Sequence, residues 1–411
     1  MNFAIQYTVD QEEFRKEVRT WMEENAKVPQ ELGPIPLESG AISREMWEWG
    51  KEFRRKLGAK GWLFALWDKE YGGGGYTADE NFIIQEELER IDVPRIYSNN
   101  FAMPALHVYG TEEQKQRFLT PLCRGELICW QGFTEPEGGS DLASLKTRAV
   151  KDGDDFIITG QKMWIGGQFE TDYIWTPAVT DPDAPRHQNL GAFMIPSDLP
   201  GITIHELNLM VKERKRLVSF DAVRVSREYL VGGETQGWRV ISASLEIEHG
   251  AGGAVRERDT LQENILEYCK QTTREGRPLS KNPFVQQGLA ENHIESSIQR
   301  LIGLRNYSMF NSGQASTYHG SQNSLLSKHY SVTKAKRVLD ALGPFAMTDD
   351  EKWGALKGRV EVNQRSSLVG LHPGGTYDVQ KLIMARRLGI SRTQERAAPT
   401  HGPTGSGSSG Q

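Results

Sequence analysis

Residues 134–141 read TEPEGGSD, a stretch in which two adjacent glycines stand among hydroxyl and carboxylate side chains. A turn explains this pattern, because Gly138 and Gly139 tolerate a positive φ and Pro136 fixes φ at an early turn position. A ligand site also explains it, because a closely bound ligand needs bare backbone N–H groups and a hydroxyl. Short glycine-rich matches are common by chance, so the stretch alone favours the turn, and the surrounding sequence has to decide.

The composition limits the class of protein. The chain has 411 residues, of which 37% are hydrophobic and 25% charged, so it can bury a large core in two or three domains. A net charge of −5 gives no basic face, and we expect no nucleic-acid partner. The N-terminus lacks a signal-peptide pattern, and no apolar run approaches the roughly 18 residues of a membrane span. These features predict a cytoplasmic protein without a membrane partner.

The cysteines give no sign of a disulfide framework or a metal site. The chain has three of them, Cys123, Cys129 and Cys269, without a CxxC motif or a histidine cluster at ligand spacing. This pattern favours reduced thiols, and we expect no metal ion.

The residue pattern changes twice along the chain. Residues 1–125 place apolar residues at helical spacing, whereas residues 126–236 contain short β-branched and aromatic runs such as DDFIITGQKMWIGG. The helical pattern resumes over residues 237–395, and residues 396–411 have the composition of a flexible tail. We therefore expect an α+β multi-domain protein divided at these positions. Three residues in the first segment are predicted helix N-caps: Ser43, Thr77 and Thr111.

Several motifs follow one another in a characteristic order. TEPEGGSD heads the β segment and GQKMWIGG follows shortly after. The other motifs are GWLFALWDKEYGG, YGTEEQKQRFLTPLCRGE, VGGETQGWRV and GGTYDVQKLIMARRLGISR. In this order and at this spacing the chain resembles the acyl-CoA dehydrogenase family over nearly all of residues 1–395. The resemblance implies an N-terminal helical domain, a middle β-barrel domain and a C-terminal four-helix bundle.

The resemblance also implies a cofactor and partners. Members of the family carry FAD, act on an acyl-CoA substrate and pass electrons to an electron-transferring flavoprotein. They are usually homotetramers, so we expect a homo-oligomer, a dimer or tetramer, with a hetero-oligomer as the alternative. The C-terminal motifs of this chain are similar to those of the bacterial catabolic members.

The family assigns part of the FAD site to the β segment. Its members line the flavin with the stretch matching residues 133–140, where backbone N–H groups meet the ring and the serine reaches the diphosphate. This context shifts the interpretation of TEPEGGSD from a turn to cofactor binding. Trp164 matches the tryptophan beside the isoalloxazine, with a β-core aromatic as the alternative. Gly166 stands where relatives often have Thr or Ser near flavin N5. The implied FAD-binding residues here are Phe133, Thr134, Gly139, Ser140, Trp164 and Gly166.

The family reaction removes the α-proton of an acyl thioester and transfers the β-hydrogen as hydride to flavin N5. An α C–H beside a thioester is weakly acidic, so the reaction needs a carboxylate base and a clamp on the carbonyl oxygen. Many relatives carry the base just before a Gly-Thr pair, where this chain has Gly374, whose N–H still suits the thioester oxygen. Other relatives carry it in Leu-x-x-Glu-Arg after Gly-Trp, and GWRVISASLEIEHG then indicates Glu248, followed by His249. Glu246 is the rival base, and either glutamate could instead be a solvated helical carboxylate.

The resemblance implies further contacts in the C-terminal segment. Arg274 and Gly343 match residues that reach the FAD of a neighbouring subunit, and Thr376 and Asp378 match residues on its adenine side. A carboxylate repels phosphate, so ribose is the expected partner of Asp378. The residues implied to contact the substrate are Ser140, Glu246, His249 and Gly374.

The acyl group and the electron acceptor stay open at the level of sequence. Residues 92–104 match the floor of the acyl pocket, and four of them are polar: Arg95, Tyr97, Asn99 and Asn100. Their polarity favours a functionalised, cyclic or aromatic acyl chain unless these side chains face solvent. A flavin oxidase or monooxygenase of the same fold is one alternative function, kept open by the missing hydroxyl at Gly166. A non-catalytic subunit of a hetero-oligomeric dehydrogenase is the other.

Overall fold

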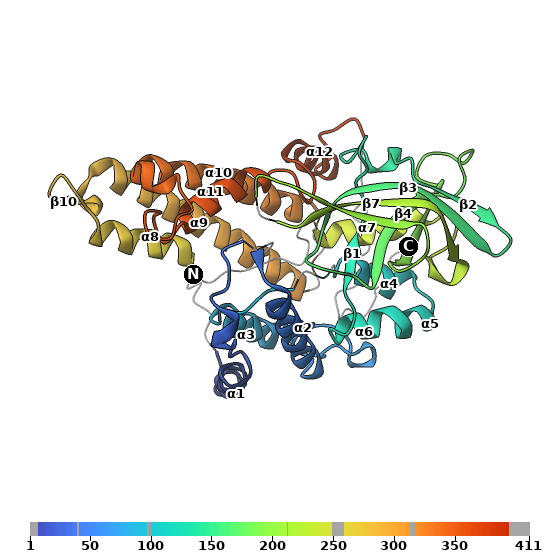
Figure 1. The fold of residues 1–411 in the computed structure, drawn as a ribbon, viewed down its shortest axis with the longest axis horizontal. Coiled ribbons are helices and arrows are strands. Elements are labelled where there is room, and N and C mark those ends of the chain that lie inside the picture. The colour runs from blue at the N-terminus through green and yellow to red at the C-terminus, as the bar shows by residue number, and fades with distance from the viewer. Residues whose placement is uncertain are drawn as a thin grey trace. The chain divides into compact units, whose positions relative to one another are not determined.

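The computed structural model describes residues 7–38, 41–96, 98, 100–211, 213–248, 259–312, 314 and 317–393. The chain forms two compact units, one within Met1–Leu245 and one within Glu246–Ala397 (Figure 1). No helix of these described ranges is long and apolar enough to cross a membrane.

The first unit begins with helices, several of which start at a capping side chain. Their bounds are α1 Val9–Asn25, α2 Arg44–Ala59, α3 Ala78–Glu89, α4 Ala102–Tyr109, α5 Glu112–Gln114 and α6 Thr120–Cys123, with a π-helical stretch Lys115–Leu119 between the last two. The predicted caps are confirmed. The Ser43 hydroxyl accepts a hydrogen bond from the Met46 N–H at 3.1 Å, and Thr77 and Thr111 each form a capping box.

A mixed β-sheet follows the helices in the first unit. Its strands are β1 Cys129–Gln131, β2 Arg148–Asp152, β3 Asp155–Gly166, β4 Tyr173–Val179, β5 Leu190–Pro196, β6 Ile202–Leu207, β7 Lys215–Ser226 and β8 Leu230–Val231. Their order is β6-β7-β3-β2-β4-β5-β8, with β1 beside β4. The α+β class is confirmed, but the expected closed barrel is wrong for the described residues. Within those residues β6 and β8 do not pair, so the sheet stays open.

Helices cover the sheet through two apolar clusters. Met46 and Trp47 of α2 pack with Trp130 and Phe220 of the strands. Leu106 of α4 belongs to a second cluster that also holds Trp175 of β4 and the first part of α7, Gly237–Glu248. The Trp175 indole N–H donates to the Ser244 hydroxyl at 3.1 Å and so fixes α7 to β4.

The second unit is a helical bundle, as predicted. Its elements after α7 are α8 Thr260–Gln271, β9 Thr273–Arg274, β10 Arg277–Pro278, α9 Pro283–Asn311, α10 His319–Leu342, α11 Arg359–Val369 and α12 Tyr377–Arg387. α10 contacts α9, α11 and α12 and is therefore the central helix. Ile265, Cys269, Val338 and Leu342 belong to the apolar core of this unit. The domain limits at residues 125, 236 and 395 stay predictions.

The TEPEGGSD stretch forms a tight turn. The Glu135 N–H donates to the Gly138 carbonyl at 2.9 Å, and the Gly138 N–H donates to the Glu135 carbonyl at 3.1 Å. Neither Gly138 nor Gly139 adopts the positive φ that glycine tolerates. The constraint on Gly139 is steric, since a Cβ at this position would lie 3.0 Å from the Thr134 methyl group. The Met163 N–H donates to the Thr134 carbonyl at 2.8 Å and ties the turn to β3.

A buried ion pair fixes the same turn. The Lys162 side chain is completely buried, and its ammonium lies 2.8 Å from the Glu135 carboxylate. That carboxylate also accepts hydrogen bonds from the backbone N–H groups of Lys146 at 2.6 Å and Thr147 at 2.9 Å. Burial alone would raise the pKa of Glu135, but the Lys162 charge and these hydrogen bonds outweigh it and lower the pKa. The carboxylate therefore stays ionised and joins the turn to β3 and to the start of β2.

We expect Lys162→Met to lower the free energy of unfolding by about 3–5 kcal/mol, because it leaves the Glu135 carboxylate buried without a counter-charge. The double variant Lys162→Met/Glu135→Gln should recover most of that loss, since no buried charge remains and the amide still accepts a backbone N–H. Urea unfolding of the three proteins measures both effects. The control Lys146→Met, which removes an exposed pair with Glu137, should leave stability nearly unchanged. Equal losses in the single and double variants would contradict this account.

Candidate active site

Trp164 lies at a break in β3. The pairing of β3 with β7 shifts register between Lys162 and Ile165, which is typical of a bulge. Trp164 adopts a φ of +61°, which is rare for a bulky residue, and its side chain is 50% exposed. The bulge thus turns the indole out of the sheet, so the β-core alternative does not hold.

The structure brings the predicted residues of the β segment together. The hydrogen bond from Met163 to Thr134 places the TEPEGGSD turn one residue from Trp164. Phe133 is buried at the base of the turn, whereas Gly139 and Ser140 are exposed. Gly166 ends β3. The result is a surface with an exposed indole, bare glycine backbone and hydroxyl groups, which suits a planar ring with a polar extension.

Sequence reasoning missed a cation at this surface. Arg186 forms an ion pair with Asp141, the residue after Ser140. It comes from the connection between β4 and β5, 45 positions along the chain from Asp141, and no motif marks it. The two opposite charges of this pair lie next to Ser140.

A left-handed turn in the second unit carries Gly374. Gly374 and Gly375 have φ values of +65° and +75°, a conformation that favours glycine. The Gly374 N–H donates no hydrogen bond to any residue in the described part of the chain. The Gly374 carbonyl accepts a hydrogen bond from the buried Gln380 amide at 2.5 Å.

Thr376 and Asp378 lie just beyond this turn, at the start of α12. Thr376 is the N-cap, and its hydroxyl oxygen accepts a hydrogen bond from the Val379 N–H at 3.3 Å. Its hydroxyl hydrogen can therefore still donate to a ligand. The Asp378 side chain is exposed and lies 3.8 Å from Lys381, so its carboxylate is open to solvent.

The structure also brings Arg274 and Gly343 together. The Arg274 guanidinium donates to the Leu342 carbonyl at 3.0 Å, at the C-terminal end of α10. Gly343 follows with a φ of +62° and ends the helix. Two residues that are far apart in the sequence thus form one surface, which holds a cation beside glycine backbone.

The two candidate bases differ in their surroundings. Glu246 is buried, and both of its carboxylate oxygens bind the Arg387 guanidinium, one of them at 3.1 Å. Arg387 also donates to the Thr317 carbonyl at 3.1 Å. Glu248 is the last residue of α7, two positions further along, and its position is therefore on another face of the helix. The Glu248 side chain and all of His249 lie outside the described residues.

The cysteines do not provide a competing reactive group. All three cysteines are free and buried, and burial raises the pKa of Cys123 and Cys129 to about 12 and that of Cys269 to about 11. None is therefore a thiolate nucleophile at neutral pH.

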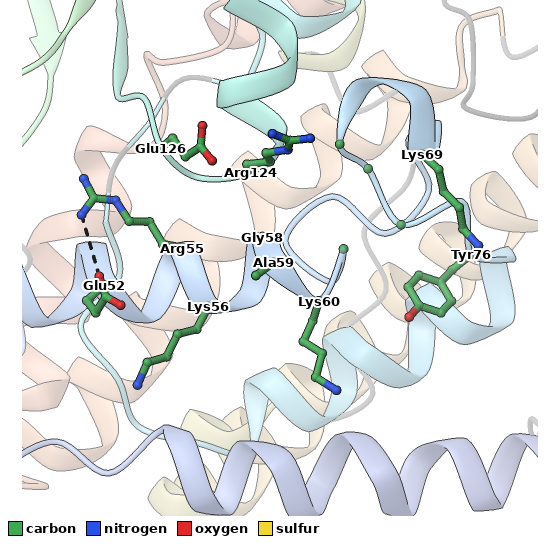
Figure 2. A pocket seen from close by; sticks show the side chains of 14 residues that line it. Glu52, Arg55, Lys56, Gly58, Ala59, Lys60, Lys69, Tyr76, Arg124 and Glu126 are labelled. Atoms are coloured by element: carbon green, nitrogen blue, oxygen red, sulfur yellow. Dashed lines mark ion pairs between the residues drawn. The ribbon is translucent and has the colours of Figure 1, made fainter.

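A cavity of about 680 Å³ lies beside α2, and no predicted site residue lines it. Figure 2 shows its cations spread around the rim rather than converging. Two of them belong to ion pairs, Arg55 with Glu52 at 3.8 Å and Lys60 with Glu17 at 3.7 Å. Close packing explains why glycines line this cavity, since a Cβ on Gly58 would lie 2.1 Å from a backbone carbonyl oxygen. We interpret this cavity as a solvated surface.

Comparison with known proteins identifies the family. The acyl-CoA dehydrogenase N-terminal, middle and C-terminal domain models match residues 8–126, 131–219 and 235–389. The chain is 31% identical over 412 residues to acyl-CoA dehydrogenase FadE26 of Mycobacterium tuberculosis, across 94% of this chain and 99% of that protein. It is 28% identical over 399 residues to acyl-CoA dehydrogenase IpdE1 of the same organism, across 93% and 98%.

Solved structures show the same fold. The ChsE4-ChsE5 complex from Mycobacterium tuberculosis matches with a TM-score of 0.79 and 28% identity, over 95% of this chain and 100% of that chain. A variant of the Tcur3481-Tcur3483 steroid ACAD matches with a TM-score of 0.80 and 26% identity, over 93% and 99%. The chain belongs to the acyl-CoA dehydrogenase family, whose members are flavin-linked oxidoreductases.

Proposed function

We propose that this enzyme uses FAD to convert an acyl-CoA thioester into the 2-enoyl-CoA. The turn at Gly374 carries the proposal. It replaces the carboxylate that many relatives place there with a glycine whose N–H has no partner in the described residues. Such a donor suits a thioester oxygen on which negative charge develops. The base must then come from elsewhere in the chain.

Glu248 is the proposed base. Its carboxylate takes the α-proton from C2 of the acyl group while the Gly374 N–H donates to the thioester oxygen. The pairing of Glu246 with Arg387 supports this assignment, because a buried carboxylate in a two-pronged ion pair is held away from a substrate. The same pairing favours a structural role for Glu246 over the predicted contact with substrate. His249 and Ser140 remain proposed substrate contacts.

The exposed surfaces of both units fit FAD. FAD supplies the acceptor for the β-hydride, at N5 of its flavin. Trp164 and the turn at residues 134–140 provide an aromatic face and polar backbone groups, and Ser140 a hydroxyl. Arg274 and Gly343 are the proposed contacts with the FAD of a neighbouring subunit, and Thr376 and Asp378 are proposed to contact the adenine side of an FAD. Arg186 is an added candidate for the diphosphate because of its positive charge.

The acyl group is proposed to be cyclic and of the steroid type. The match to a structure described as a steroid ACAD supports this proposal. The polarity of residues 92–104 does not, because Asp92, Arg95 and Asn100 of that segment are exposed. Within residues 92–104, the Arg95 carbonyl accepts a hydrogen bond from the Gln168 amide at 2.9 Å. Tyr97 and Asn99 lie outside the described residues.

The proposed electron acceptor is an electron-transferring flavoprotein. A flavin oxidase or monooxygenase is the second candidate, favoured by the missing hydroxyl at Gly166. Anaerobic turnover with a ferrocenium dye, without turnover in O2, separates the dehydrogenase from the oxidase.

We expect FAD to bind partly through Trp164. Trp164→Ala should raise the Kd of FAD about fivefold, since aromatic stacking contributes on the order of 1 kcal/mol. Stability should change little, because the indole is already half exposed. Trp353→Ala removes another exposed tryptophan and serves as the matched control. Fluorescence titration gives the Kd of FAD for wild type and for both variants. Equal Kd values for Trp164→Ala and wild type would rule out Trp164 as part of the FAD site.

We expect Glu248→Gln to retain FAD and acyl-CoA but to reduce the flavin at least about 10²–10⁴-fold more slowly, because an amide cannot accept the α-proton. Glu246→Gln should lose stability, since Arg387 loses its counter-charge, yet keep much of the rate. Stopped-flow absorbance of the flavin measures both variants. A rate near wild type in Glu248→Gln, or a collapse in Glu246→Gln alone, would transfer the role of base to another residue.

The enzyme is proposed to act as an oligomer. Two matching structures are named after pairs of chains, ChsE4-ChsE5 and Tcur3481-Tcur3483, so a second copy or a related chain is the expected partner. Because Arg274 and Gly343 match contacts with a neighbouring subunit's FAD, cofactor retention should depend on assembly. Sedimentation with absorbance detection tests this expectation, and a monomer that keeps its FAD would refute it.

A further inference from the structure

A buried lysine holds the turn that leads to Gly374. Lys328 lies on α10, and only 7% of its surface is exposed. Its ammonium donates hydrogen bonds to the Gly370 carbonyl at 3.0 Å and to the Pro373 carbonyl at 2.6 Å. A buried ammonium is costly unless its donors are satisfied, so these bonds fix the turn to α10.

The bond to Pro373 acts directly on the proposed donor. The Pro373 carbonyl and the Gly374 N–H belong to one peptide unit, which is planar. The described residues contain no cis peptide bond, so this C=O and N–H point in opposite directions. Holding the carbonyl against Lys328 therefore sets the direction of the N–H. A hydrogen bond from a cation also polarises the peptide and makes its N–H a stronger donor.

The peptide on the other side of Gly374 is held as well. The completely buried Gln380 amide donates to the Gly374 carbonyl at 2.5 Å. Both peptide planes that meet at Gly374 are thus anchored, one from α10 and one from α12. The φ of +65° that this arrangement requires favours glycine.

The turn borders open space. Gly374 and Lys328 both line a cavity of about 470 Å³, whose other walls are mostly serine and asparagine side chains of α10 and α11. A ligand can therefore approach the turn without displacing apolar packing.

We propose that Lys328 is a positioning residue that orients and polarises the Gly374 N–H for the thioester oxygen. This inference rests on the proposed function, in which that N–H is the oxyanion donor. The charge of Lys328 acts through the peptide and not by contact with the substrate, so its removal should weaken the donor without abolishing it.

Acetoacetyl-CoA provides a test without redox turnover. Loss of its C2 proton to the base or to solvent leaves an enolate whose charge lies partly on the thioester oxygen. A strong donor lowers the apparent pKa of the bound probe, and the enolate absorbance across a pH series measures that pKa. Losing an entire oxyanion donor costs about 10²–10³-fold, so weakening one in Lys328→Met should raise the pKa by about one unit, a tenfold change.

Matched variants separate this effect from a loss of structure. Lys334→Met removes a second part-buried lysine of α10, which binds Asp259 at 3.0 Å and does not contact the turn, so its probe pKa should equal wild type. Lys328→Gln keeps an uncharged donor, is less disruptive to folding, and should also raise the pKa. If either Lys328 variant folds and gives the bound probe the same pKa as wild type, the inference about Lys328 is overturned but the donor role of Gly374 is not. A wild-type enzyme that does not lower the pKa below that of free acetoacetyl-CoA would overturn the donor role of Gly374 and the inference with it.

Discussion

A fully buried ammonium group needs a counter-charge at hydrogen-bond distance, and Glu135 provides it for Lys162. This pair joins the TEPEGGSD turn to β3 at the point where the strand bulges. The bulge holds Trp164 in a backbone conformation that a bulky residue adopts only when its surroundings impose it. The exposed indole and the polar turn can form one surface because the charge pair beneath them fixes both segments.

Buried charges play the same part in the second unit. Arg387 holds Glu246, and Lys328 holds the carbonyls that precede Gly374. Each of these groups is paired within the protein and so stabilises the backbone around the proposed chemistry. The groups assigned to the reaction differ from these paired groups. The Gly374 N–H has no partner in the described residues, and Glu248 occupies a position on a different helix face from the paired carboxylate.

Features set by local sequence could be predicted, and features set by distant contacts could not. The N-caps at Ser43, Thr77 and Thr111 depend on residues three positions away, and the longer strands on runs of β-branched and aromatic residues. β2 has no such run, because its sequence, RAVKD, is mostly exposed and charged. The prediction of a closed barrel was wrong, because closure depends on pairing between the outermost strands of the sheet. The partner of Glu246 lies 141 positions away, so no sequence pattern could show that this carboxylate is already engaged.

Anaerobic titration of the purified enzyme with a panel of acyl-CoAs tests the central claim most directly. The panel should include straight-chain thioesters and the CoA thioester of a steroid carboxylic acid. The visible absorbance of the flavin and the mass of the CoA product are recorded together. The account predicts that the flavin bleaches and that the acyl group loses one proton and one hydride, most efficiently with the steroid thioester. An unbleached flavin and an unchanged thioester across the whole panel would contradict it.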